Sequence, residues 1–178
     1  MCDMCNGATM QEVLDNMHRK IASNGFTTMS VEATARTKEW SYTIGLRHNH
    51  DHPELVVAGY PHQGAVAVLS ELAAEVVKGD RFDIPGDRVL FHDAEIGVVP
   101  VHAQYLKGEL MAAWHWYSDA VGRPDLEPEA LQIVLPDDQR CFHHQTTQPR
   151  LDKPGALVAM NRQERRRRAS RSGRRSGG

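Results

Sequence analysis

The stretch WSYTIGLRHNHDHPELVVAGYP, residues 40–61, decides the fold. Its two ends, at 40–46 and 54–60, are rich in β-branched and aromatic residues, a composition that favours strands. The second end is almost entirely apolar, which is typical of a deeply buried strand. Because only the short polar segment RHNHDHP at 47–53 separates them, the pattern predicts neighbouring antiparallel strands.

The segment before this stretch predicts a helix followed by a first strand. Thr9 and Glu12 have the spacing of a capping box, in which the two side chains satisfy free backbone N–H groups at a helix start. Gly25 is suited to end the helix in a left-handed turn, and the alternating segment FTTMSVEAT at 26–34 predicts a strand. The apolar face of the helix is formed by Met10, Val13, Leu14, Met17 and Ile21.

The segment after this stretch alternates between helical and strand patterns. Pro100 indicates an edge strand or a bend, because proline cannot donate a hydrogen bond within a sheet. The expected elements are helices at 62–78 and 105–120 and short strands at 81–84, 89–92, 96–103 and 131–137. The chain is therefore predicted to be α+β, a single domain with a mainly antiparallel twisted sheet and about three helices packed on it. One core is expected to hold Leu46, Leu55, Val57, Leu69, Leu72 and Ile133.

The C-terminal residues 161–178 differ in charge from the rest of the chain. They contain eight arginines and one glutamate and carry a net charge of +7, whereas the remainder carries −9. Such a composition predicts disorder. The tail is either a solvated segment without a role or a site of non-specific contact with nucleic acid through Arg165, Arg166, Arg167 and Arg168. We therefore expect a flexible N-terminus at 1–8, an α+β domain at 9–158 and a disordered tail at 159–178.

No stretch approaches the roughly 20 apolar residues that span a bilayer, and the N-terminus MCDMCNGATM lacks the features of a secretory signal. Three cysteines are too few for a disulfide framework. A cytoplasmic location without a membrane partner is expected.

Four motifs occur in a fixed order along the chain: WSYTIGL, HPELVVAG, LQIVLPDDQRCF and QPRL. Together they resemble the bacterial domain-of-unknown-function family 4262. The resemblance covers about Thr9 to Leu151. It implies a shared fold, but no particular reaction, because the activity of the family is unassigned. The matching positions are Trp40, Tyr42, Thr43, Gly45, Leu46, His52, Pro53, Glu54, Leu55, Gln132, Pro136 and Asp137.

The matching residues concentrate at 40–46 and 52–54, so we predict a ligand-binding site there. His52 and Glu54 are also candidates for proton transfer, because an imidazole titrates near neutrality and a neighbouring carboxylate tunes it. The alternative is that Trp40, Tyr42 and Trp114 fill a core, which is the commoner use of aromatic residues. The candidate ligand-binding residues are Trp40, Tyr42, Thr43, His52 and Glu54.

The alternating His48, His50 and His52 would point the same way on an extended segment, as the ligands of a metal site do. However, Asn49 and Asp51 favour bends, and tight zinc binding needs about four ligands. We predict that the three histidines do not together bind a metal and that His52 alone is structurally engaged.

A second candidate metal site uses the cysteines. Cys2, Cys5 and Cys141, with His143 or His144, would form a Cys₃His zinc set. The Cys-x-x-Cys spacing also fits a redox dithiol or no role at all.

The sequence leaves three functional classes open. The leading hypothesis is a small-ligand or partner-binding module of unassigned activity. The alternatives are a metal-dependent enzyme that uses the histidine segment and a nucleic-acid accessory protein that acts through its tail. Cofactors and catalysis stay undecided at this stage.

Overall fold

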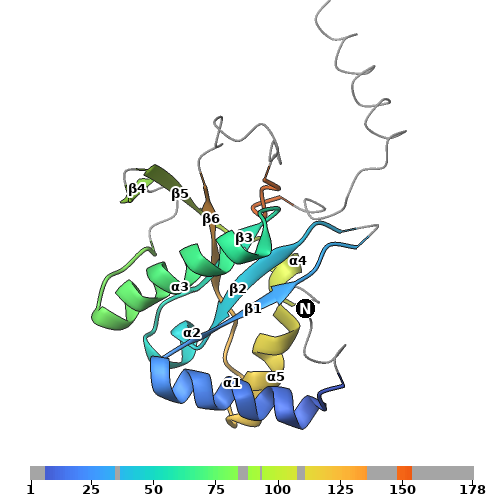
Figure 1. Cartoon of the computed structure of the whole chain (residues 1–178). Coiled ribbons are helices and arrows are strands. Elements are labelled where there is room, and N and C mark those ends of the chain that lie inside the picture. Colours follow the sequence, from blue (N-terminus) through green and yellow to red (C-terminus); the bar gives the residue numbers. More distant parts are fainter. Residues whose placement is uncertain are drawn as a thin grey trace, which may run out of the picture.

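The computed structural model describes residues 7–34, 37–83, 88–92, 94–107, 111–135 and 148–153. Its centre is a six-stranded sheet of order β1-β2-β3-β6-β5-β4, with helices on both faces (Figure 1). The strands are β1 (Thr27–Val31), β2 (Trp40–Ile44), β3 (Glu54–Ala58), β4 (Arg88–Phe91), β5 (Ala94–Pro100) and β6 (Ala130–Val134). The helices are α1 (Met10–Asn24), α2 (Leu46–Asn49), α3 (His62–Lys78), α4 (Ala103–Leu106) and α5 (Ala112–Ala120). No helix among the described residues has the length and apolar character needed to cross a membrane.

Helix α1 has both of the ends that its sequence predicts. The Thr9 hydroxyl accepts the backbone N–H of Glu12 at 3.3 Å, and the Glu12 carboxylate accepts the backbone N–H of Thr9 at 2.7 Å. Gly25 adopts a left-handed conformation with φ 83°, and its N–H donates to the carbonyl of Ile21. Between these ends, Val13, Met17 and Ile21 are buried, so the predicted apolar face is the packed face.

The sheet is mainly antiparallel, as predicted. β1, β2 and β3 form a meander in which Tyr42 lies opposite Met29 on one side and Val56 on the other. β5 also runs antiparallel to both of its neighbours, β4 and β6. The parallel pair joins β3 to β6, with Leu55 opposite Leu131. A parallel neighbour requires a long crossover, and the chain between these two strands contains α3, α4 and α5.

Two hydrophobic clusters cover the two faces of the sheet. Helix α3 packs over one face, and α1, α4 and α5 pack over the other. Because β2 and β3 lie between both clusters, every residue of these two strands is buried. The predicted common core is confirmed, since the α3 cluster contains Leu46, Leu55, Val57, Leu69, Leu72 and Ile133.

Some predicted elements are wrong in detail. The described chain has five helices and not about three, because the segment at 47–53 begins in the helical turn α2, and α4 and α5 replace one helix at 105–120. Residues 81–83 are not a strand. Pro100 ends β5, an interior strand, and it is tolerated there because its missing N–H falls at the last position of the strand.

Candidate functional site

The centre of the candidate site is the carboxylate of Glu54, fully buried at the start of β3. Its Oε1 atom accepts the backbone N–H groups of Gly45 at 2.9 Å and Arg47 at 3.2 Å, and Oε2 accepts that of Leu46 at 3.3 Å. Gly45 makes this convergence possible with φ 117°, a conformation that favours glycine. A Cβ at this position would also lie only 2.8 Å from the carbonyl oxygen of Gly25.

Two side chains complete the environment of the Glu54 carboxylate. The Thr43 hydroxyl donates to Oε2 at 2.6 Å, and the indole Nε1–H of Trp114 donates to Oε1 at 3.1 Å. The Thr43 oxygen also accepts the backbone N–H of Leu55 at 2.9 Å. The carboxylate therefore joins β2, the start of α2, β3 and α5.

The electrostatics of Glu54 combine two opposed effects. Burial raises the pKa of the carboxyl to about 7, while the hydrogen bonds from Thr43, Arg47, Gly45 and Trp114 lower it. Because both oxygens already accept donors from the protein, a substrate proton would have to displace one of them. This geometry favours a positioning role for Glu54 over that of a general base.

His52 is held separately from Glu54. Its Nε2 accepts the backbone N–H of Phe82 at 3.0 Å, so Nδ1 carries the proton and donates to the carbonyl of Pro53 at 2.7 Å. His52 is thus structurally engaged, as predicted. Burial lowers the pKa of His52, which favours this neutral form. No hydrogen bond joins His52 to Glu54 among the described residues, so the two proton-transfer candidates do not form a pair there.

His48 is also engaged, so the prediction that His52 alone has a structural role is wrong. Its half-buried ring lies 5.0 Å from the ring of Trp114 and 4.9 Å from that of Tyr117, and its Nε2 bonds the hydroxyl of Ser118 at 2.8 Å. Burial, followed by the positive charges of Arg123 and Arg47, lowers the pKa of His48 to about 4. The physical reason for the error is the helical turn α2, which directs His48 toward α5, where its partner Ser118 lies 70 residues away in the sequence.

His50 points in a third direction. A Cβ built at Gly25, the end of α1, would lie 2.7 Å from the Nε2 atom of His50. The three histidines therefore face α5, the end of α1 and Phe82 respectively. Among the described residues, no three His, Cys, Asp or Glu side chains gather as metal ligands do.

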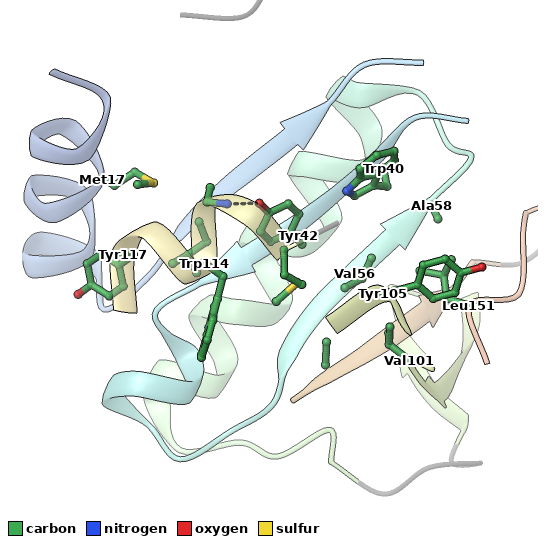
Figure 2. Close-up of a cluster of buried hydrophobic side chains, with 14 of the residues drawn as sticks. Met17, Trp40, Tyr42, Val56, Ala58, Val101, Tyr105, Trp114, Tyr117 and Leu151 are labelled. Atoms are coloured by element: carbon green, nitrogen blue, oxygen red, sulfur yellow. Dashed lines mark hydrogen bonds between the residues drawn. The ribbon is translucent and has the colours of Figure 1, made fainter. Parts of the chain in front are cut away.

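The aromatic candidates lie inside the protein. Trp40, Tyr42 and Trp114 belong to one hydrophobic cluster, as core packing predicts, with Met17 and Tyr117 beside them (Figure 2). The Tyr42 hydroxyl accepts the backbone N–H of Ala113 at 3.2 Å, a bond that ties β2 to α5.

A side-chain clasp that the sequence did not reveal lies beside this cluster. The amide of Gln132 in β6 donates to the carbonyl of Pro149 at 2.7 Å and accepts the N–H of Leu151 at 2.7 Å. It holds the segment 148–153, which we call the strap, against the sheet, with Leu151 fully buried. A glutamine within an apolar strand indicates that a buried polar side chain needs a partner. The sequence does not show which partner, because Pro149 lies 17 residues away.

Several candidate positions lie outside the described residues. They are Cys2, Cys5, Pro136, Asp137, Cys141, His143, His144, Arg165, Arg166, Arg167 and Arg168.

This geometry accounts for most of the matched positions that the structure describes. Thr43 and Gly45 each donate to Glu54, His52 accepts the N–H of Phe82, and Leu46 and Leu55 lie in the core. A family model described as Domain of unknown function (DUF4262) matches residues 20–148. The chain belongs to this family. The match is narrower than the expected span, since it begins within α1 and ends at the first residue of the strap.

No curated protein matches the chain, and no solved structure matches it. Where the structure describes the four motifs of this DUF4262 chain, most of their residues lie in a buried frame of strands and hydrogen bonds.

Proposed function

We propose that this DUF4262 chain is a partner-binding module that takes up an extended segment of another protein at the β4 end of its sheet. The observation that carries this proposal is Leu90, whose side chain is 75% exposed on β4. A single exposed leucine is ordinary, but β4 is also an edge of the sheet in the described part of the chain. An edge strand offers free N–H and C=O groups to an added strand.

Leu90 belongs to an apolar surface on the sheet face opposite α3. We call it the sheet-end surface. Its apolar members are Leu90, Gly97, Val99 and Val134, and the exposed Glu95 lies on the same face, opposite Leu90. The strand register and the alternation of side chains place these residues on one face. Val99 and Val134 are only half-buried, and a Cβ at Gly97 would meet only Val134 among the described atoms, at 3.7 Å. Helices α1 and α5 lie over the other end of the sheet (Figure 1).

The residues predicted as ligand contacts have a positioning role in this proposal. They are Trp40, Tyr42, Thr43, His52 and Glu54, and all five are buried. Their contacts hold β2, β3, α2 and α5 together, and β3 pairs with β6, through which β5 and β4 join the sheet. A rigid edge costs less entropy when an extended partner is added than a mobile edge does.

A small-ligand site has less support. A depression of about 500 Å³ lies along α1, but it is lined by Glu12, Asp15, His18 and Arg19. Ligand pockets are mostly lined by apolar and aromatic residues, whereas all four residues here are polar or charged. The metal-dependent and nucleic-acid alternatives gain no supporting contact from the described residues. A cytoplasmic location stays part of the proposal on the grounds of its cysteine content.

The proposal is tested by selecting extended peptides from a displayed library against the full-length chain. Selected peptides should shift the amide resonances of β4 and should lose about tenfold or more in affinity with Leu90→Lys, since a lost leucine contact weakens binding by about 1.5–3 kcal/mol. Val77→Lys is the matched control, because Val77 is 37% exposed on α3, on the other face. A library that yields no binder, or equal losses in both variants, would overturn the proposal.

A further inference from the structure

In the part of the chain that the structure describes, the buried carboxylate of Glu54 has no cation as an ion-pair partner. Arg47 directs its guanidinium to Asp51 and Glu129, with 3.2 Å to the latter. A buried charge without a counter-ion is costly and is retained only where hydrogen bonds replace its hydration. The ionised state of Glu54 therefore depends on the five hydrogen bonds that it accepts.

The titratable groups that surround Glu54 add no compensating charge. Tyr42 from β2 and Tyr117 from α5 are neutral, and burial raises the pKa of each hydroxyl further. His48 from α2 is kept neutral because burial and nearby arginines lower its pKa to about 4. Strand β3 carries no other charged residue, and burial raises the pKa of Glu54 to about 7. The ionised and neutral forms of Glu54 are therefore close in free energy near neutral pH.

The geometry also provides for the neutral form. A proton from solvent on Oε2 would find an acceptor in the hydroxyl oxygen of Thr43, 2.6 Å away. That oxygen already accepts the N–H of Leu55 and retains a second lone pair, so the Thr43 proton can rotate away. The other donor to Oε2 is the N–H of Leu46, which is the most distant of the five donors at 3.3 Å. Protonation of Oε2 would therefore weaken this hydrogen bond most.

We propose that Glu54 is a proton-controlled latch for α2: proton uptake by its carboxylate weakens the hydrogen bonds from the first amides of α2 and from Trp114, and so frees α2 from β3 and α5. The latch is closed when Glu54 is ionised and opens when it is neutral. α2 contains only four residues and makes few hydrogen bonds of its own, so it depends on this shared acceptor. The inference is independent of the binding role proposed for β4.

The latch is tested by following amide and indole resonances of the full-length protein between about pH 5 and 8. The amides of residues 45–47 and the Trp114 indole N–H should titrate with one common midpoint, with the largest change at Leu46. The Glu54 carboxyl carbon, observed directly in the unmodified protein, should share that midpoint. Glu54→Gln should abolish the common titration, and Glu129→Gln is the control, because Glu129 is an exposed carboxylate that pairs with the Arg47 side chain.

The outcomes separate clearly. A shared midpoint that survives Glu129→Gln and disappears in Glu54→Gln supports the latch. If Glu54→Gln does not fold, the carboxyl and amide titrations of the unmodified protein still decide the matter. A Glu54 carboxyl that titrates without moving the amides of residues 45–47, or that stays ionised down to pH 5, overturns the inference.

Discussion

The hydroxyl of Thr43 donates a 2.6 Å hydrogen bond to the carboxylate of Glu54, which ties the end of β2 to the start of β3 inside the core. The same oxygen accepts the backbone N–H of Leu55 at 2.9 Å. One small side chain therefore satisfies a buried charge and a buried amide together. This double use explains why a threonine, which offers a donor and an acceptor in one rigid group, is suited to this position.

Thr43→Val should destabilise the protein by about 2–4 kcal/mol, because it leaves a buried carboxylate and a buried N–H each short of a partner. Valine keeps the shape and removes only the hydroxyl, so the loss reports hydrogen bonding and not packing. The free energy of unfolding in urea is the measurement. Thr43→Ser retains the hydroxyl and should lose less, and an equal loss in both variants would show that the hydroxyl is not the important group.

The pKa of His48 should lie well below its ordinary value and should depend on Arg123. Burial and two positive charges lower this pKa to about 4 in the folded protein, against 6.5 for a free imidazole. Since the folded pKa is depressed, the stability that neutral His48 contributes is present above pH 6.5 and is lost as the pH falls toward 4.

Proton NMR of the His48 ring measures this pKa directly. Arg123→Gln should raise the pKa of His48 toward its ordinary value, whereas Arg123→Lys keeps the charge and should leave it low. If both variants behave alike, the charge of Arg123 is not a cause of the depression.

The strands and the two longest helices could be predicted from sequence because their signals are local. The capping box of Thr9 and Glu12, the left-handed Gly25 and the apolar run that begins at Leu55 each report on neighbours within a few residues. The parallel pairing of β3 with β6 has no such signal, since it joins residues more than 70 positions apart.

The candidate site could be predicted only in part, for the same reason. Thr43 and Glu54 were predicted to belong to one site, but Trp114 was not placed with them, because its bond to Glu54 spans 60 residues. His48 was misjudged because its partner Ser118 lies 70 residues away, and the helical turn that follows the left-handed Gly45 directs the ring toward it. Local periodicity cannot show such a turn when only four residues follow it.

Leu55→Ala should cost about 2–5 kcal/mol in the free energy of unfolding, the range for a leucine removed from a packed core. Leu55 is fully buried in the cluster beneath α3. Leu90→Ala is the matched control, because Leu90 is exposed and its loss should stay within about 0.5 kcal/mol. Similar losses for the two leucines would contradict the assignment of Leu90 to an open surface.

Gln132→Leu should release the strap from the sheet. Its amide is the partner of two backbone groups, the carbonyl of Pro149 and the N–H of Leu151, and leucine can satisfy neither. Two unsatisfied buried groups cost about 2–4 kcal/mol together, even though leucine fills a similar volume. Part of this destabilisation should appear as local opening, because the strap can detach while the six strands stay paired.

Limited proteolysis with trypsin distinguishes these two events, since Arg150 is exposed within the strap and is a cleavage site. Cleavage after Arg150 should become faster in Gln132→Leu at urea concentrations where the sheet is still folded. Gln63→Leu, an exposed glutamine on α3, should change neither the unfolding free energy nor the cleavage rate. The N–H of His102 also holds the carbonyl of Leu151 at 2.8 Å, so partial retention of the strap is expected. Unchanged cleavage in Gln132→Leu would mean that this bond, the bonds from Tyr105 to Lys153 and from Leu135 to Gln148, and the burial of Leu151 hold the strap without Gln132.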